Sequence, residues 1–167
     1  MKTQDQQRDM DGRHPGAQAE FDLETFLPYL LNQAAEATSK SFQATYRAVY
    51  GMSRTQWRVM ANLGKFGAMT ARDICAISHI EKTKVSRAVA TMEAEGLLLR
   101  TTSPQDRRAE ILSLTVKGNE VFRDLGQRAI AYDRDLRDQL GTALSGQFEG
   151  MLRTLITQNG QDRTDED

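Results

Sequence analysis

Three absences limit what this chain of 167 residues can be. It has a single cysteine, so an internal disulfide is impossible and a cytoplasmic location is expected. No apolar run approaches the ~20 residues that a membrane-spanning helix needs. The amino terminus also lacks the apolar segment of a signal peptide. The sequence therefore predicts a cytoplasmic protein that has no membrane partner.

The chain also lacks the common signatures of catalysis and metal binding. It contains no glycine-rich phosphate loop, no G-x-S-x-G and no H-E-x-x-H sequence. Its two histidines, His14 and His79, are far apart and form no ligand cluster with Cys75, so neither a metal site nor a cofactor is expected. Cys75 lies between apolar neighbours, where a cysteine is usually structural, and a redox role is the alternative. We predict that the protein is not an enzyme.

Charge is nearly balanced over the whole chain, with a net of −1, but it is unevenly distributed. Residues 53–117 hold 11 Lys and Arg against 6 Asp and Glu, which gives this segment a net charge of +5. The segments on either side are acidic. A basic segment between acidic ends predicts an anionic partner, and chance clustering of charge on solvated helices is the alternative.

Apolar residues recur at helical spacing through most of the chain. Two capping-box patterns, Ser53 with Gln56 and Thr70 with Asp73, mark the starts of helices. The spacing predicts helices at residues 23–50, 54–63, 71–77, 81–94, 116–140 and 144–158, and the strands of a β-hairpin at 97–101 and 109–114.

This order of elements predicts a mainly α fold with a small β-hairpin wing. A winged helix-turn-helix lobe is expected at residues 51–117, after a first helix at 21–50 that serves dimerisation and contacts the lobe. Helices for dimerisation follow at 118–158. The polar residues 1–20 and the acidic residues 159–167 are expected to be disordered tails.

The fourth predicted helix has the pattern of a recognition helix. Its apolar residues fall on one face, which leaves a short polar and basic strip on the other. Such a strip suits the major groove of DNA, where arginine pairs bidentately with guanine and hydroxyl groups reach bases or phosphates. The alternative is an ordinary solvated face. The predicted contacts of this helix are Lys82, Thr83, Lys84, Ser86, Arg87 and Thr91.

The hairpin tip carries two adjacent arginines, Arg107 and Arg108, next to Asp106. Arginine is attracted to the negative potential of the minor groove, so we expect this pair to enter or border that groove. Asp106 would orient one of the two by a charge-assisted hydrogen bond. Thr70 and Arg72, at the start of the third helix, are candidate contacts of a DNA phosphate.

The segments "TQWRVM" (55–60), "TARDICAISHIEKTKVSRAV" (70–89), "MEAEGLLLR" (92–100) and "SPQDRRAEILSLTVKG" (103–118) resemble MarR-family transcriptional regulators. The resemblance implies a homodimer in which each subunit brings a winged helix-turn-helix to a pseudo-palindromic operator. It places the recognition helix at residues 82–94 and the wing arginine at Arg107 or Arg108. It also implies release of DNA when a small anion, commonly aromatic or phenolic, binds between the dimer helices and the lobe.

Apolar residues of the last two predicted helices support a dimer. A stripe at alternating spacings of four and three runs along the fifth helix, and the sixth helix adds a second set. Together with the first helix, this is more apolar surface than a lobe of this size can cover, although packing within one subunit is the alternative. The residues are Gly118, Phe122, Leu125, Ala129, Tyr132 and Leu136, then Leu144, Phe148, Leu152, Leu155 and Ile156.

The sequence also contains candidate residues for an effector pocket. Aromatic side chains and nearby arginines supply the chemistry for an aromatic anion, but aromatics at helical spacing also form ordinary core. The candidate pocket residues are Tyr29, Phe42, Tyr46, Arg47, Trp57 and Arg58.

We therefore expect a sequence-specific, homodimeric repressor of transcription that a small molecule releases from DNA. The alternatives are a DNA-binding protein that has no effector and a protein-interaction module on the same fold.

Overall fold

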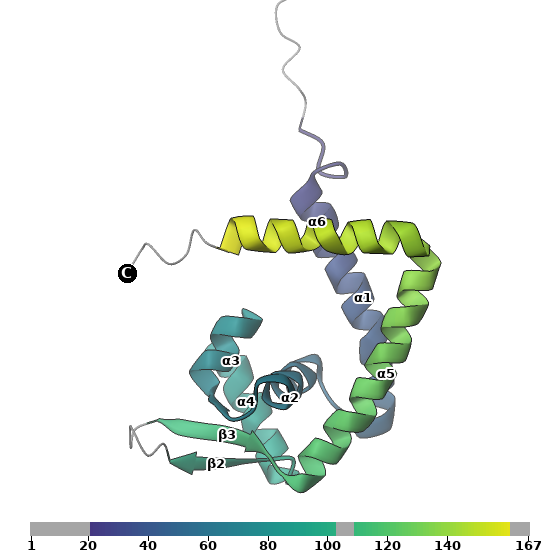
Figure 1. Cartoon of the computed structure of the whole chain (residues 1–167). Coiled ribbons are helices and arrows are strands. Elements are labelled where there is room, and N and C mark those ends of the chain that lie inside the picture. Colours follow the sequence, from purple (N-terminus) through teal and green to yellow (C-terminus); the bar gives the residue numbers. More distant parts are fainter. Residues whose placement is uncertain (1–20, 103–108, 161–167) are drawn as a thin grey trace, which may run out of the picture. The chain divides into compact units, whose positions relative to one another are not determined.

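The computed structural model describes residues 21–102 and 109–160, and it shows a mainly helical chain with one small sheet (Figure 1). The chain divides into two compact units, one ending at Ala37 and one beginning at Thr38, with the boundary inside the first helix. The helices are α1 (Leu27–Tyr50), α2 (Arg54–Phe66), α3 (Ala71–Ser78), α4 (Lys82–Ala94), α5 (Val116–Leu140) and α6 (Thr142–Gly160), and the strands are β1 (Met69–Thr70), β2 (Leu98–Thr102) and β3 (Glu110–Leu114). The predicted fold class is confirmed.

Local capping chemistry explains where α2 and α3 begin. The Ser53 hydroxyl accepts the backbone N–H of Gln56, whose side chain accepts the backbone N–H of Ser53 in return. Thr70 and Asp73 make the same reciprocal pair at the start of α3. Each box satisfies two backbone donors that a helix start leaves free, as the sequence predicted. At its other end α3 stops at His79, which takes the left-handed conformation with φ of 50°.

Several helix boundaries differ from the prediction. The first helix begins at Leu27 rather than near residue 23, because the Asp22 side chain accepts the backbone N–H of Glu24 and holds a turn there. The second continues to Phe66, three residues beyond its predicted end at Leu63. The sixth is longer than predicted at both ends.

The sheet has three antiparallel strands in the order β1-β3-β2, one more than the predicted hairpin. In the register Arg100 lies opposite Leu112, and Met69 lies opposite Leu112 on the other side. The added strand β1 has only two residues and comes just before α3. It therefore fixes the start of α3 against the base of the wing.

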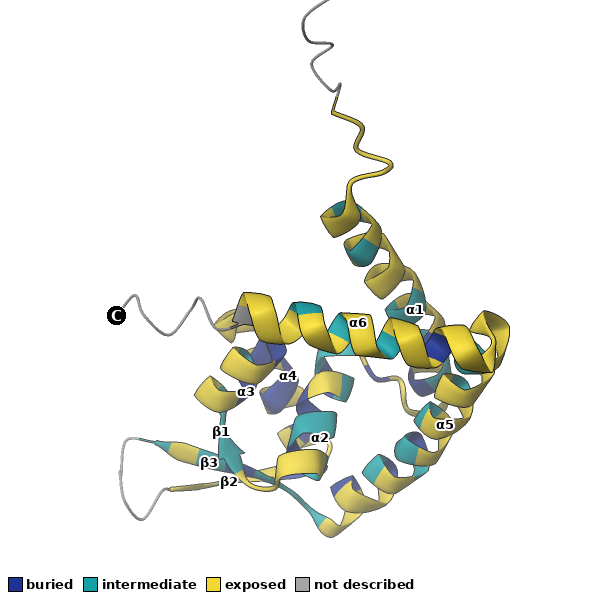
Figure 2. Cartoon of the chain, turned by 45° about the horizontal axis from the view of Figure 1, so that its top comes forward, coloured by how far each residue is buried: buried dark blue, intermediate teal, exposed yellow. Residues whose placement is uncertain are grey.

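The core lies where α2, α3, α4 and the start of α5 meet the sheet, shown dark blue in Figure 2. The predicted inner face of the fourth helix is confirmed, because Val85, Ala88, Val89 and Met92 are all buried. The buried apolar residues are Phe42, Tyr46, Met52, Val59, Met60, Leu63, Ile74, Val85, Ala88, Val89, Met92, Leu97, Leu98, Leu112, Val121 and Leu125.

The apolar stripe of α5 packs largely within its own chain. Leu125 is fully buried, and Phe122, Ala129 and Tyr132 pack against the core. Helix α5 approaches the backbone at Leu97 so closely that a Cβ at Gly118 would collide with the Leu97 carbonyl. One subunit thus accounts for most of a stripe that was expected to support a dimer.

The second half of α5 contacts α6 through an ion-pair network. Arg137 bonds Asp133 at 2.7 Å (Nε to Oδ2) and Glu149 of α6 at 2.8 Å (Nη1 to Oε2). Many apolar side chains of α6 remain exposed, and the helix is mostly yellow in Figure 2. None of the helices in the described ranges meets the length and hydropathy needed to cross a membrane.

Candidate nucleic-acid interface

Helix α4 packs on α2, on α3 and on β2, and its opposite face is open to solvent. All six residues predicted to contact DNA from this helix have exposed side chains: Lys82, Thr83, Lys84, Ser86, Arg87 and Thr91. The Arg87 guanidinium makes no hydrogen bond or ion pair with the described residues, so it is free to bond an external acceptor. The structure therefore presents this strip to solvent as predicted, and its contact with DNA stays a prediction.

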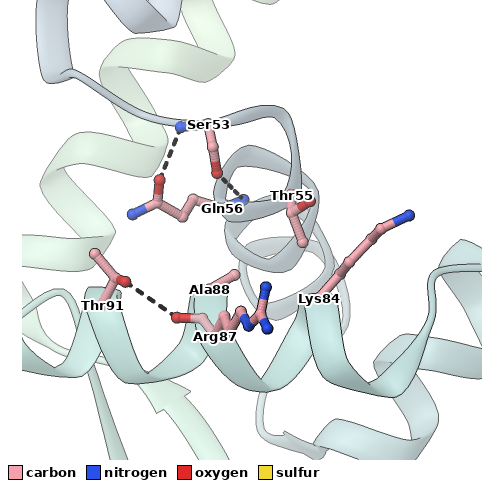
Figure 3. A pocket seen from close by; sticks show the side chains of 7 residues that line it. All are labelled: Ser53, Thr55, Gln56, Lys84, Arg87, Ala88 and Thr91. Carbon is pink, nitrogen blue, oxygen red and sulfur yellow. Dashed lines mark hydrogen bonds between the residues drawn. The ribbon is translucent and has the colours of Figure 1, made fainter.

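A hollow of about 370 Å³ lies between this strip and the first turn of α2. Figure 3 shows Lys84, Arg87, Ala88 and Thr91 of α4 facing Ser53, Thr55 and Gln56 across it. The Thr91 hydroxyl donates to the carbonyl of Arg87, within the helix. From the sequence, Ser53 and Gln56 were assigned only a capping role, and Thr55 was assigned none. Their position beside α4 depends on how α2 packs, which local spacing does not encode.

A second hollow, of about 340 Å³, lies beside the start of α4. Thr55 and Lys84 line both hollows, so the two adjoin. The second hollow is lined by Arg54, Thr55, Arg58, His79, Ile80, Glu81 and Lys84. Glu81 is the one acidic side chain in this lining. Its Oε2 forms an ion pair with Nζ of Lys84 at 3.2 Å. Arg58, predicted as an effector contact, thus lies beside the recognition helix.

At the base of the wing, Arg100 connects three elements. Its Nε donates to Glu93 near the end of α4, and its Nη1 donates to Glu110 at the start of β3, both at 2.9 Å. The hydrogen bonds to Glu110 and Glu93 raise the pKa of the Arg100 side chain, which stays charged at all accessible pH values. The sequence did not single out this residue. The predicted wing contacts Asp106, Arg107 and Arg108 lie outside the described residues.

The two candidate phosphate contacts of α3 differ in availability. The Thr70 hydroxyl is engaged with Asp73, donating to its carboxylate at 2.7 Å and accepting its backbone N–H. The hydrogen bonds from Thr70 hold the pKa of the Asp73 carboxyl below its usual value, so a negative charge occupies the start of α3. Arg72 is exposed. Of the two, Arg72 is the better candidate.

Three of the six candidate effector residues, Phe42, Tyr46 and Trp57, form one aromatic cluster that also includes Tyr132. The Phe42 ring centroid lies 5.5 Å from Tyr46, 5.5 Å from Trp57 and 5.3 Å from Tyr132, and Tyr46 stacks on Trp57 at 5.9 Å. Burial raises the pKa of the Tyr46 hydroxyl, and the charges of Arg54 and Arg58 oppose that shift. The cluster is therefore part of the core and lies near two cationic side chains.

The other three candidates are one tyrosine and two arginines. Arg47 is exposed on α1, Arg58 lines the second hollow, and Tyr29 belongs to the unit that ends at Ala37. Arg58 acts through its charge on Tyr46 of the aromatic cluster, and a pocket formed by the six residues stays a prediction.

Cys75 is partly buried and packs against the core from α3, consistent with the structural role expected for it. Within the described ranges, no three His, Cys, Asp or Glu side chains come together as a metal site would require.

The order of the elements and the exposed basic helix match known regulators. The sequence profile of the MarR family matches residues 50–109. A crystal structure of a MarR-family transcriptional regulator from Silicibacter pomeroyi superposes with a TM-score of 0.72 at 30% identity, over 83% of this chain and 98% of that one. The chain belongs to the MarR family of transcriptional regulators.

Curated MarR-type relatives of this chain are transcriptional regulators as well. A putative regulatory protein for the hcr operon of Thauera aromatica is 22% identical over 89% of this chain and 95% of its own length. The homoprotocatechuate degradative operon repressor of Escherichia coli is 27% identical over 58% of this chain and 64% of its own length. The family consists of regulators and not of enzymes, and its DNA-binding lobe in this chain is the winged helix built by α2 to β3.

Proposed function

We propose that this MarR-family protein is a homodimeric repressor that binds a pseudo-palindromic operator and is released from it by a small aromatic or phenolic effector. The single observation that carries the proposal is the exposed strip of α4, with Arg87 free of any partner in the described residues. A guanidinium free in the unbound protein bonds guanine O6 and N7 without first breaking an internal ion pair.

The composition of the strip supports reading of bases by direct contact. Lys82, Lys84 and Arg87 supply positive charge, and Thr83, Ser86 and Thr91 supply hydroxyl groups along the same exposed surface. The lysines attract phosphates of any sequence, whereas Arg87 and the hydroxyl groups form directional bonds with base edges. Arg107 and Arg108 would add minor-groove contacts from the wing.

Exposed apolar side chains support a second copy of the chain as the partner. On α6, Leu144 is 64% exposed, Met151 59% and Ile156 71%. In the unit that ends at Ala37, Leu27 and Leu30 are also exposed. Exposed apolar side chains in such number on helices are typical of an obligate interface. A two-fold interface would present two recognition helices to half-sites separated by about one DNA turn, ~34 Å.

The effector is proposed from relatives. A repressor related to this chain governs a homoprotocatechuate degradative operon. Two solved proteins of the same fold, 23% and 21% identical to this chain, are BpsR of Bordetella bronchiseptica, whose DNA binding 6-hydroxynicotinic acid regulates, and NadR in complex with 4-hydroxyphenylacetate. An effector relieves repression when it prefers the non-binding conformation by a few kcal/mol.

The test is a binding selection from a randomised duplex pool with the wild-type protein, the Arg87→Ala variant and the Arg107→Ala/Arg108→Ala variant. We expect a two-fold symmetric motif with half-sites one turn apart. Arg87→Ala should lose the motif, and the wing variant should weaken binding. A reporter gene under the selected operator then distinguishes repression from activation.

Other outcomes point to the two alternatives. A selected motif whose binding no aromatic acid reverses, with unchanged melting temperatures across a ligand panel, favours a regulator that has no effector. Absence of any motif, with only weak and salt-sensitive binding, contradicts the repressor and favours a protein-interaction module.

A further inference from the structure

A cluster of basic side chains lies beside the start of α4 and shares Lys84 with the exposed strip. Arg54 and Arg58 from α2 and Lys84 from α4 line the hollow of about 340 Å³ described above. The Arg58 guanidinium is exposed and makes no hydrogen bond or ion pair with the part of the chain that the structure describes. The hollow thus offers a free cation next to the recognition helix.

We propose that this hollow binds a phosphodiester group of the DNA backbone, held by Arg58 and Lys84 and by the hydroxyl group of Thr55. The site deepens the proposed function and rests on it, because it assigns a register-setting contact to the lobe that reads DNA. Arg58 and Thr55 thereby act as DNA-binding residues.

The chemistry of the hollow suits a phosphate. A guanidinium presents two parallel N–H donors that match two phosphate oxygens, an ammonium adds a point charge, and a hydroxyl adds a third kind of donor. Thr55 and Lys84 line both hollows. A DNA strand whose sugar-phosphate backbone passes Arg87 would therefore continue past Lys84 into the second hollow. Contacts of this kind fix the position of a reading helix and carry no sequence information themselves.

Glu81 opposes the proposed ligand. Its carboxylate pairs with Lys84 at 3.2 Å, and the side chains of Lys84 and Glu81 are 61% and 70% exposed. Such an exposed pair is weak, so a phosphate can displace the carboxylate from Lys84. The displaced Glu81 still lies beside the hollow and repels the phosphate. Glu81 therefore limits DNA affinity, and its removal should strengthen binding.

The experiment measures dissociation constants over a series of salt concentrations on two duplexes, the selected operator and a random sequence. The proteins are the full-length wild type and the variants Arg58→Ala, Arg58→Lys, Glu81→Gln and Arg87→Ala. Arg123→Ala is the matched control, because Arg123 is an exposed arginine of α5 far along the chain from the hollow. Thermal melting checks that each variant is folded.

We expect Arg58→Ala to weaken binding to both duplexes by about three- to tenfold and to lower the salt slope by about one per subunit. Arg58→Lys should retain most of the slope. Glu81→Gln should strengthen binding to both duplexes, Arg87→Ala should weaken only operator binding strongly, and Arg123→Ala should match the wild type.

Wild-type affinity and slope in Arg58→Ala, on both duplexes, would overturn the phosphate site, whatever Arg87→Ala does. A different result would overturn the proposed function, namely that the protein prefers no sequence over random DNA. In that case, binding of Arg58→Ala to the random duplex still tests the phosphate site. A wild-type protein that binds neither duplex overturns both proposals.

Discussion

Arg100 in β2 holds Glu93 at the end of the recognition helix, with 2.9 Å between Nε and Oε2, while its Nη1 bonds Glu110 of β3. One guanidinium thereby ties α4 to both strands of the wing. In the proposed function the helix and the wing both contact DNA, so this bridge fixes how the base of the wing is held against the helix.

We predict that Arg100→Leu weakens operator binding roughly three- to tenfold while the protein remains folded. In the variant the wing moves more freely relative to α4, so it loses more conformational entropy when DNA binds. The variant also leaves the carboxylates of Glu93 and Glu110 without their cationic partner. All three side chains are partly exposed, so the loss in the free energy of unfolding should be about 1 kcal/mol or less. Fluorescence anisotropy and thermal melting measure the two effects.

A double-mutant cycle separates positioning from general damage. If Arg107 and Arg108 contact DNA as proposed, Arg100→Leu should cost much less affinity in the Arg107→Ala/Arg108→Ala background. Equal losses in both backgrounds would contradict a positioning role for Arg100.

The close contact of α5 with the lobe yields a second prediction. A Cβ at Gly118 meets the Leu97 carbonyl, whereas a Cβ at Gly126, two turns further along the same helix, meets no atom within 4 Å. Gly118→Ala should therefore destabilise the protein by about 2 kcal/mol or more. Gly126→Ala should be neutral or stabilise it by up to ~1 kcal/mol, since alanine favours helix. Urea denaturation of both variants checks the contrast, and equal stabilities would contradict it.

Local chemistry made the helix starts and the recognition helix predictable. The capping boxes at Ser53 and Thr70 need only residues three positions apart, and the inner face of α4 follows from the helical period. Strand β1 was missed because two residues carry no periodicity. Its pairing of Met69 with Leu112 bridges more than forty positions.

The candidate site was predictable only where one helix carries it. Arg100 bonds residues seven and ten positions away on two other elements, and Arg58 reaches the hollow through the packing of α2 on α4. The stripe of α5 shows the same limit, because a helical period looks identical whether Phe122 packs on its own lobe or on a partner subunit. Periodicity predicts a buried face and does not identify what covers it.

The cap of α3 should make stability depend on acid pH. Hydrogen bonds from Thr70 lower the pKa of Asp73 from its ordinary value of 3.8. A carboxyl group whose pKa is lowered in the folded protein stabilises the fold at pH values above its ordinary pKa. This stabilisation is lost as the pH falls through the lowered pKa. We expect Asp73→Asn to melt below the wild type at pH 7, with the difference narrowing towards pH 3. A difference independent of pH would contradict this account.

The proposed dimer predicts the effect of charge on α6. Leu144→Glu/Met151→Glu places two carboxylates on the exposed apolar surface of α6. A two-fold interface would bury these carboxylates from both subunits with no cation to pair with them. We expect this variant to sediment as a monomer and to bind the operator far more weakly. Thr157→Glu, on another face of α6, is the matched control and should sediment like the wild type. A wild type that is monomeric at micromolar concentration would contradict the dimer.

Trp57 provides a direct test of the effector. It is the single tryptophan of the chain and packs against Phe42 and Tyr46, so its fluorescence reports on the aromatic cluster. If hydroxylated aromatic acids bind there, titration should change this fluorescence and release the operator with the same midpoint. Phe42→Leu should shift both midpoints, whereas Phe66→Leu, at an exposed phenylalanine ending α2, should shift neither. Operator release without any fluorescence change would place the effector outside this cluster, because a ring inserted among these side chains displaces contacts that Trp57 makes at 5.5 and 5.9 Å.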